Sequence, residues 1–253
     1  MDKRRRLEQL ANVTNSFPIT FWSAEEFTSS AVSEGRLWWI RSSSPAEGSR
    51  RPLTSDEVRS YIRNQNRGFV VQEFLASQCS GVTFVGASHS LSEAAAGGCE
   101  SILRAGSRGS RWASSRSGSI MWTTGNAVSY PDLEETSRMQ ACELDVMGTD
   151  PTGYMFEWIV DQSGRHVWVD MKYLGLAYVS PFAPRAPADY HIGEELGDDS
   201  GVGASILDTS LAYTYLIYGS SRGLLTCERG SPLAHLCVLA YQAGVGVLVP
   251  EVD

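Results

Sequence analysis

The sequence predicts a protein of the mixed α/β (α+β) class, divided into two parts. Short runs rich in Val, Ile, Phe and Trp, typical of strands, alternate with segments that carry helix-start signals. A stretch rich in proline, glycine and acidic residues, 181–204, interrupts the alternation and is expected to be a linker. It separates a larger N-terminal part, 1–180, from a small C-terminal α/β unit, 205–253.

The composition indicates an ordinary globular chain and excludes some partners. The 253 residues are 42% hydrophobic and 20% charged, enough for one large domain or two modest ones. A net charge of −8 argues against general nucleic-acid binding, and the basic run Lys3–Arg6 is expected to be a solvated terminal segment. No apolar run is long enough to span a membrane, and the N-terminus has no apolar segment of a secretory signal. We therefore expect neither a nucleic-acid nor a membrane partner.

The cysteines indicate the compartment. They are odd in number, scattered, and lack C-x-x-C spacing. Their pattern therefore predicts neither a zinc site nor a disulfide framework. We expect reduced, mostly buried thiols in a cytoplasmic protein. The five are Cys79, Cys99, Cys142, Cys227 and Cys237.

Two strands and three helices are predicted before residue 76. The strands are 37–45, which runs into a polar turn, and 68–75. The third helix has the clearest start, because Thr54 and Glu57 have capping-box spacing, and it is expected to end near Gly68. The other two helices are a polar one at the N-terminus and one around 24–32.

The next segment is rich in Gly, Ser and Ala. After a strand at 80–86, we expect a strand or turn leading to Glu93, a short helix at 98–104 and then loop to 119. A helix follows over 131–147. Its expected apolar set is Leu133, Met139, Cys142, Leu144 and Val146.

A hairpin is predicted from strands 154–161 and 166–174, with 162–165 as the turn. Glu157 and Asp170 lie inside these otherwise apolar strands. A carboxylate there is costly unless it is paired with a cation or bound to a metal. The histidines outside the C-terminal unit have no partner pattern and are expected at the surface: His89, His166 and His191.

In the C-terminal unit, a single histidine follows a strong helix start. Ser231 is a good N-cap, Pro232 suits the first helical position, and Gly244 ends the helix. His235 lies about one turn in, near the positive end of the helix dipole, where a phosphorylated imidazole would be stabilised. By itself the stretch is also consistent with a histidine that only hydrogen-bonds its neighbours.

Several stretches, taken in chain order, carry a family resemblance. Residues 40–44 resemble a V-R-S-S strand end, and 70–75 with 80–84 resemble V-V-Q-x-M-V … S-G-V-x-F. Residues 156–158 with 169–172 resemble I-E-W … V-Q-A-R. Two further stretches, 93–98 and 226–235, resemble E-A-x-x-G-L and T-x-x-G-G-x-x-S-H. In this order they resemble the phosphoenolpyruvate synthase and pyruvate phosphate dikinase family.

The resemblance implies a truncated ATP-grasp domain followed by a small swivelling β/β/α phosphohistidine domain. It also implies an ATP-dependent phosphotransferase of the kinase or dikinase type, which uses ATP and Mg²⁺ and passes a phosphoryl group to His235. An unknown small molecule or protein would then accept the group. The resemblance implies these roles: Arg41 and Lys172 as catalytic cations with His235; Arg41, Gln72, Glu73, Phe74, Leu75, Glu93 and Lys172 as nucleotide-binding residues; Glu157 and Asp170 as magnesium ligands.

The chain also departs from the family pattern. It has no G-G-K lysine near its start and no F-A-G phosphate loop, and no segment resembles the barrel that binds pyruvate. Asp170 replaces a glutamine and Lys172 an arginine, which loses bidentate geometry. Alternatives therefore stay open: an inactive relative that binds a nucleotide or a partner, or one part of a split enzyme. Glu157 and Asp170 could also form a purely structural cluster with Lys172.

Overall fold

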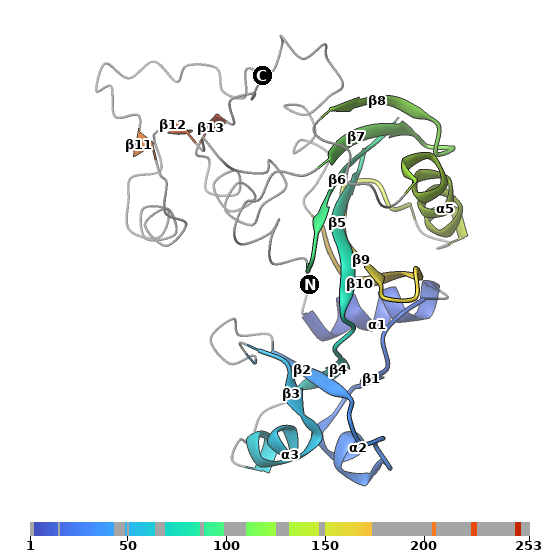
Figure 1. Cartoon of the computed structure of the whole chain (residues 1–253). Coiled ribbons are helices and arrows are strands. Elements are labelled where there is room, and N and C mark those ends of the chain that lie inside the picture. Colours follow the sequence, from blue (N-terminus) through green and yellow to red (C-terminus); the bar gives the residue numbers. More distant parts are fainter. Residues whose placement is uncertain are drawn as a thin grey trace.

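The structure, a computed structural model, describes most of the N-terminal part of the chain. It also describes the backbone of three short strands near the C-terminus (Figure 1). Among the helices of this described part, none is both long and apolar enough to cross a membrane. The described residues are 3–14, 16–42, 49, 51–63, 69–86, 89–98, 110–124, 132–146, 150–173, 204–205, 224–226 and 246–248.

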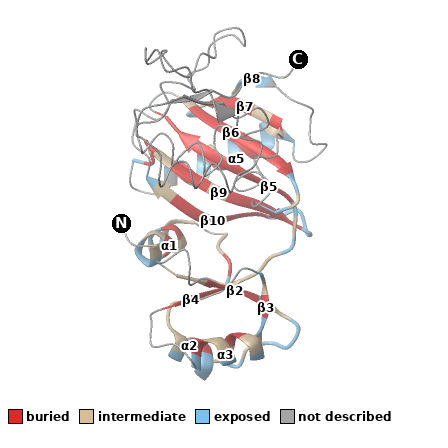
Figure 2. Cartoon of the chain, turned by 90° about the vertical axis from the view of Figure 1, so that its left-hand side faces the viewer, coloured by how far each residue is buried: buried red, intermediate tan, exposed pale blue. Residues whose placement is uncertain are grey.

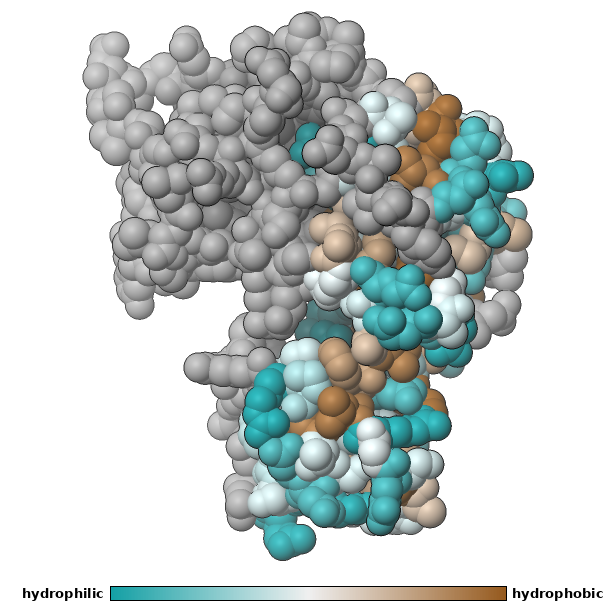
Figure 3. Space-filling model, viewed as in Figure 1, coloured by the Kyte–Doolittle hydropathy of each residue, from teal (hydrophilic) through white to brown (hydrophobic). Residues whose placement is uncertain are grey.

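A small four-stranded sheet with two helices forms one unit. Its strand order is β1-β4-β2-β3, and each neighbouring pair is antiparallel. On the face that Figure 3 shows, hydrophilic residues line the sides and the bottom of this unit, and hydrophobic residues lie between them. Its core contains Phe27, Trp38 and Ile40. The elements are β1 (Thr20–Phe21), α2 (Ala24–Ser29), β2 (Leu37–Arg41), β3 (Leu53–Thr54), α3 (Ser55–Arg63) and β4 (Val70–Glu73).

The predicted capping box at the start of α3 is confirmed. The backbone N–H of Thr54 donates to Glu57 Oε2 over 2.8 Å, and the N–H of Glu57 donates to Thr54 Oγ1 over 3.3 Å. This exchange satisfies two donors that the first turn of a helix otherwise leaves open. The sequence thus located this helix start to the residue.

A six-stranded antiparallel sheet forms the larger unit. Its order is β10-β9-β5-β6-β7-β8, and Figure 2 shows buried residues along most of its central strands. Helix α1 (Lys3–Val13) packs along the edge strand β10, and α5 (Leu133–Val146) covers one face. The strands are β5 (Ser77–Val85), β6 (His89–Ala96), β7 (Ser110–Ser115), β8 (Ile120–Thr124), β9 (Tyr154–Asp161) and β10 (His166–Tyr173).

The predicted hairpin is confirmed as β9 and β10. Asp161 Oδ1 accepts from the backbone N–H groups of Ser163 and Arg165, and Gly164 has a φ of +85°. That φ suits glycine, because other residues rarely adopt the left-handed region. The predicted loop before residue 119 is wrong in part, because 110–115 is strand β7. Its Ser- and Ala-rich sequence has little intrinsic strand preference, so pairing with β6 decides its conformation.

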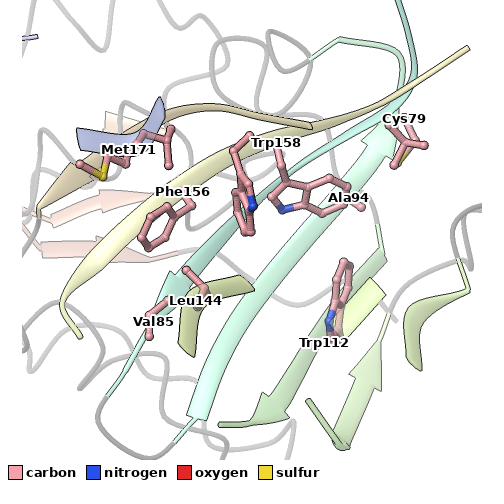
Figure 4. Packing of buried hydrophobic residues seen from close by; sticks show 11 residues of the cluster. Cys79, Val85, Ala94, Trp112, Leu144, Phe156, Trp158 and Met171 are labelled. Atoms are coloured by element: carbon pink, nitrogen blue, oxygen red, sulfur yellow. The ribbon is translucent and has the colours of Figure 1, made fainter. Parts of the chain in front are cut away.

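The helix-covered face of the large sheet holds the main core. Trp112, Phe156 and Trp158 lie on this face with Leu144 of α5 (Figure 4). Gly81 lies beneath Trp158, and a Cβ added to it would come within 2.1 Å of the indole ring. The glycine is therefore required so that the indole can lie flat on the strand.

Helix α5 is confirmed, but the expected apolar set is wrong for Cys142, which is exposed. The helix buries the polar residues Thr136, Ser137 and Gln140 in addition to Leu144. Ser137 Oγ accepts from Trp112 Nε1 over 2.7 Å, so a polar helix stripe is hydrogen-bonded to the sheet. A search for apolar periodicity alone cannot find such a contact face.

The three C-terminal strands form a parallel sheet. Its order is β11 (Ala204–Ser205), β12 (Leu224–Thr226) and β13 (Gly246–Leu248). Strands β12 and β13 lie within residues 205–253, where the sequence predicts a small α/β unit. His235, residues 181–203 of the predicted linker and residues 99–104 of the helix predicted at 98–104 lie outside the described residues. Ala204, the last residue of the predicted linker, belongs to β11.

Candidate functional site

A β-bulge brings the two strand carboxylates to the same face of the large sheet. Trp168 pairs with Trp158, but Asp170 pairs with Glu157, so Val169 is an extra residue in β10. Without this extra residue, Asp170 would point to the opposite, core-facing side, because a shift by one reverses every side chain. Directly paired residues have Cβ atoms about 5 Å apart. The two predicted metal ligands are therefore neighbours on the face opposite α5.

Asp170 is buried but not isolated. Its Oδ1 accepts from the backbone N–H of Met171 over 2.9 Å, and its Oδ2 lies 3.4 Å from Lys3 Nζ. Lys3 was expected to belong to a solvated basic run, and its ion pair with a buried carboxylate corrects that expectation. The carboxylate pair thus has a cation of α1 beside it.

Lys172 lies on the same face, two residues after Asp170. Burial lowers the pKa of its ammonium group, and the positive charge of Arg6 lowers it further. Glu157 and Asp170 act in the opposite direction and raise the pKa of Lys172. One side of the hairpin therefore combines cations and carboxylates within interaction range.

An apolar patch adjoins these charges. Ile159, Val167 and Val169 form a buried cluster, and Leu75 of the connection between β4 and β5 packs against it. Along β9, Ile159 and Glu157 point to the same side and are one strand repeat, about 7 Å, apart. The face thus changes from apolar to charged along the strand, which is the pattern that a base followed by phosphates requires.

Glu93 lies on the same row of the sheet. The register aligns Arg111, Glu93, Val82, Glu157 and Asp170 across five strands. Glu93 is 2% exposed, and Arg111 Nε donates to its Oε1 over 2.7 Å. Its carboxylate is therefore engaged by an arginine, and it lies about 10 Å, two strand spacings, from Glu157.

The remaining predicted residues cluster on β2 and β4. Arg41 Nε donates to Gln72 Oε1 over 3.2 Å, while the Nε2 of Gln72 is buried and has no hydrogen-bond partner among the described residues. Glu73 forms an ion pair of 3.0 Å with Arg36. The ring of Phe74 packs edge-on against Trp39 at 6.0 Å. The structure thus joins Arg41 to Gln72, and Leu75 to the face that carries Glu157.

The donor set of this face fits a nucleotide with Mg²⁺. Magnesium prefers oxygen ligands, uses one or two carboxylates, and takes its other oxygens from phosphates and water. Glu157 and Asp170 supply such carboxylates, and Lys172 supplies a cation for phosphate. No group of three or more His, Cys, Asp or Glu residues within the described ranges forms a self-sufficient metal site.

Sequence reasoning missed a polar network on the opposite face. His166 was expected at the surface, which is wrong. It is the first residue of β10, and it is buried where α5 contacts the sheet. Its Nε2 lies 3.1 Å from Gln140 Nε2, and its Nδ1 lies 3.9 Å from Glu143 Oε2. Burial lowers the pKa of His166 to about 3, so the imidazole is neutral near pH 7 and the 3.9 Å contact is not an ion pair.

Comparisons with known proteins give distant structural likenesses. No family model and no curated protein matches the chain. It is similar to the ATP-grasp ligase PsnB complexed with its minimal precursor, at 13% identity and a TM-score of 0.40, over 68% of this chain and 50% of PsnB. It is also similar to the macrocyclase MdnC from Microcystis aeruginosa MRC bound with precursor peptide MdnA, at 14% identity and a TM-score of 0.38, over 74% and 55% of the two chains.

A third likeness has similar values. The N5-carboxyaminoimidazole synthetase from Staphylococcus aureus is 10% identical, with a TM-score of 0.41, over 68% of this chain and 43% of that one. The chain thus spans about half the length, or less, of these solved structures. Values this low leave the functional assignment to the residues of the chain itself.

Proposed function

We propose that the chain is an ATP-dependent phosphotransferase of the ATP-grasp type, with Mg²⁺–ATP on the charged face of the large sheet. The observation that carries this proposal is the bulge at Val169, because it pairs Asp170 with Glu157 on the strand that also carries Lys172. In the proposal, the two carboxylates are the magnesium ligands. Bulges that re-aim one side chain are enriched next to active sites. The patch around Leu75 would receive the base. Further nucleotide contacts are assigned to Arg41, Gln72, Glu73, Phe74 and Glu93.

The proposed reaction continues at His235, which belongs to the C-terminal unit. A neutral imidazole nitrogen attacks a phosphorus of ATP, a nitrogen–phosphorus bond forms, and the bond from phosphorus to the bridging oxygen breaks. Attack on the γ-phosphorus releases ADP and leaves one phosphoryl group on the histidine. Attack on the β-phosphorus releases AMP and leaves the β- and γ-phosphates together on the histidine, so the γ-phosphate must pass to water or inorganic phosphate before a phosphohistidine remains. The phosphohistidine then gives its group to a small molecule or protein acceptor. Resemblance to the dikinase-type family supports this step.

Calorimetry with Mg²⁺–ATP tests the binding part of the proposal. Glu157→Gln keeps the shape of the side chain but removes its charge, and should weaken affinity by at least about tenfold. The matched control is Asp145→Asn, which removes an exposed carboxylate of α5 and should leave affinity unchanged. Equal affinities of the wild type and Glu157→Gln would contradict the assigned magnesium site.

Labelling tests the transfer. The full chain is incubated with Mg²⁺ and ATP labelled at the β- or the γ-phosphate, and the wild type is compared with His235→Ala. An acid-labile, base-stable label on the wild type alone establishes the phosphohistidine, and the labelled position identifies the transferred phosphate. Binding without a label would instead identify a nucleotide-binding module.

A further inference from the structure

Helix α1 brings two basic side chains to the sheet edge beside the carboxylate pair. Lys3 contacts Asp170, and Arg6 lies on the same side of the helix, because residues three apart share a helix face. Leu7 and Leu10 are fully buried, so α1 is packed firmly against the large unit along β10. The packing of α1 therefore determines where both cations lie.

Arg6 is half-buried, and one nitrogen of its guanidinium group is enclosed without a partner in the described part of the chain. Its Nε atom is buried and has no hydrogen-bond partner among the described residues. No carboxylate of the described part of the chain lies within ion-pair distance of Arg6. A buried charged donor without an acceptor is unfavourable, so such groups usually face a bound anion or a carboxylate.

A second cation faces Arg6 from the sheet. The contact of Lys3 with Asp170 places this end of α1 beside the stretch of β10 that carries Lys172, and the positive charge of Arg6 lowers the pKa of Lys172 accordingly. Two cations held near each other by packing attract an anion into the space between them. A guanidinium group suits phosphate particularly well, because its planar donors match two phosphate oxygens at once.

We propose that Arg6 of α1 and Lys172 of β10 together bind the phosphate chain of the nucleotide next to Glu157 and Asp170. This inference rests on the proposed nucleotide site and adds a residue to it. The sequence has no G-G-K lysine near its start, and Arg6 would supply the missing cation from the N-terminal helix. Lys3 and Arg6 then have a function, whereas Arg4 and Arg5 of the same run are exposed, as expected for a solvated segment.

A ligand series tests this assignment on the full chain by calorimetry. Adenosine, Mg²⁺–ADP, Mg²⁺–ATP and tripolyphosphate are titrated into the wild type, Arg6→Gln and Arg6→Lys. Arg6→Gln should leave adenosine affinity unchanged but weaken Mg²⁺–ATP at least tenfold, while Arg6→Lys should retain part of it. The matched control is Arg5→Gln, because Arg5 is the exposed neighbour on the same helix, and its affinities should stay within twofold.

Thermal melting separates binding from folding. If Arg6 binds an anion, Arg6→Gln should melt at the wild-type temperature or higher without ligand, and should lose the rise that tripolyphosphate causes. If Arg6 is only structural, the variant should melt lower without ligand, which overturns the inference. Wild-type binding of Mg²⁺–ATP that Arg6→Gln leaves unchanged overturns it too, while the proposed function stands. Arg6-dependent binding of tripolyphosphate without any binding of ATP keeps the anion site and refutes the nucleotide function.

Discussion

The large sheet has two polar surfaces, which differ in the charge of their groups. On the α5 side, Trp158 Nε1 donates to Thr83 Oγ1, and Thr83 donates to Gln140, which also contacts the neutral His166. On the other side lie ions, and within the described residues the Nε of Arg6 has no hydrogen-bond partner. The neutral polar groups bond mostly to one another and fix a helix on a sheet, although the Nδ1 of His166 has no hydrogen-bond partner in the described part of the chain. The ions of the other face are the groups that the proposed function assigns to a ligand.

Alternation along the strand separates these surfaces at the level of single residues. Glu157 and Trp158 are consecutive in β9, yet they belong to opposite faces. In β10 the bulge changes this alternation once and moves Asp170 to the charged face. A substitution on the core face should therefore lower stability, while a substitution at the next residue, on the charged face, should mainly weaken nucleotide binding.

The largest effect is expected at Trp158. Replacement by Ala removes a fully buried indole and its hydrogen bond to Thr83, and should lower the free energy of unfolding by about 3–5 kcal/mol. Glu157→Gln should change it by about 1 kcal/mol or less, because Glu157 is only half-buried. Urea denaturation measures both variants. A strong loss of stability in Glu157→Gln would mean that the two faces are both structural.

The next effect concerns the ion pair of Glu93 and Arg111. Arg111→Met leaves a buried carboxylate without its cation and should cost about 3 kcal/mol at pH 7. The double variant Glu93→Gln/Arg111→Met should regain most of this loss, because no charge is then left unpaired. If the single variant is as stable as the wild type, a second cation must stabilise the carboxylate of Glu93. That result would favour a role for Glu93 in binding the nucleotide.

Acid should weaken the helix-covered face through His166. The pKa of its imidazole is about 6.5 unfolded and about 3 folded, so the unfolded state binds the extra proton between these values. Its contribution to stability is complete above pH 6.5 and decreases as the pH falls toward 3. Between pH 7 and pH 5 the free energy of unfolding should therefore decrease by about 2 kcal/mol. Glu143 acts in the opposite direction, because burial raises the pKa of its carboxyl group.

His166→Gln isolates this contribution, since glutamine does not titrate. Urea denaturation at pH 7 and pH 5 should show a smaller difference for the variant than for the wild type. Equal pH dependence in both proteins would assign the acid sensitivity to groups other than His166.

Local signals in the sequence were sufficient for some elements and insufficient for others. Thr54 and Glu57 identified a helix start, because a capping box involves only neighbours in sequence. The paired carboxylates followed from two apolar strands joined by a short turn. The β7 strand was not predictable, because Ser and Ala gain strand structure only through pairing with β6.

The residues of the proposed site could be selected from the sequence only in part, for a similar reason. Glu157, Asp170 and Lys172 were selected from the hairpin, and the structure brings them to one face. Arg6 was missed, because its distance in sequence from Lys172 hides their proximity, which depends on how α1 packs on β10. The sequence did offer one signal. Leu7 and Leu10 are apolar at helical spacing, which indicates that this helix packs on the protein and can hold Arg6 in a fixed position.

The smallest predicted effect tests whether the polar stripe of α5 has any role beyond packing. Ser137→Ala removes the acceptor of the indole N–H of Trp112 and should cost about 1 kcal/mol, because a buried donor loses its partner. Mg²⁺–ATP affinity, measured on the same sample, should equal that of the wild type, because Ser137 lies across the sheet from Glu157. Arg138→Gln, a change at an exposed neighbour on α5, is the control for stability. A change in ATP affinity with Ser137→Ala would mean that the two faces communicate through the strands, and that the helix-covered side helps to form the binding surface.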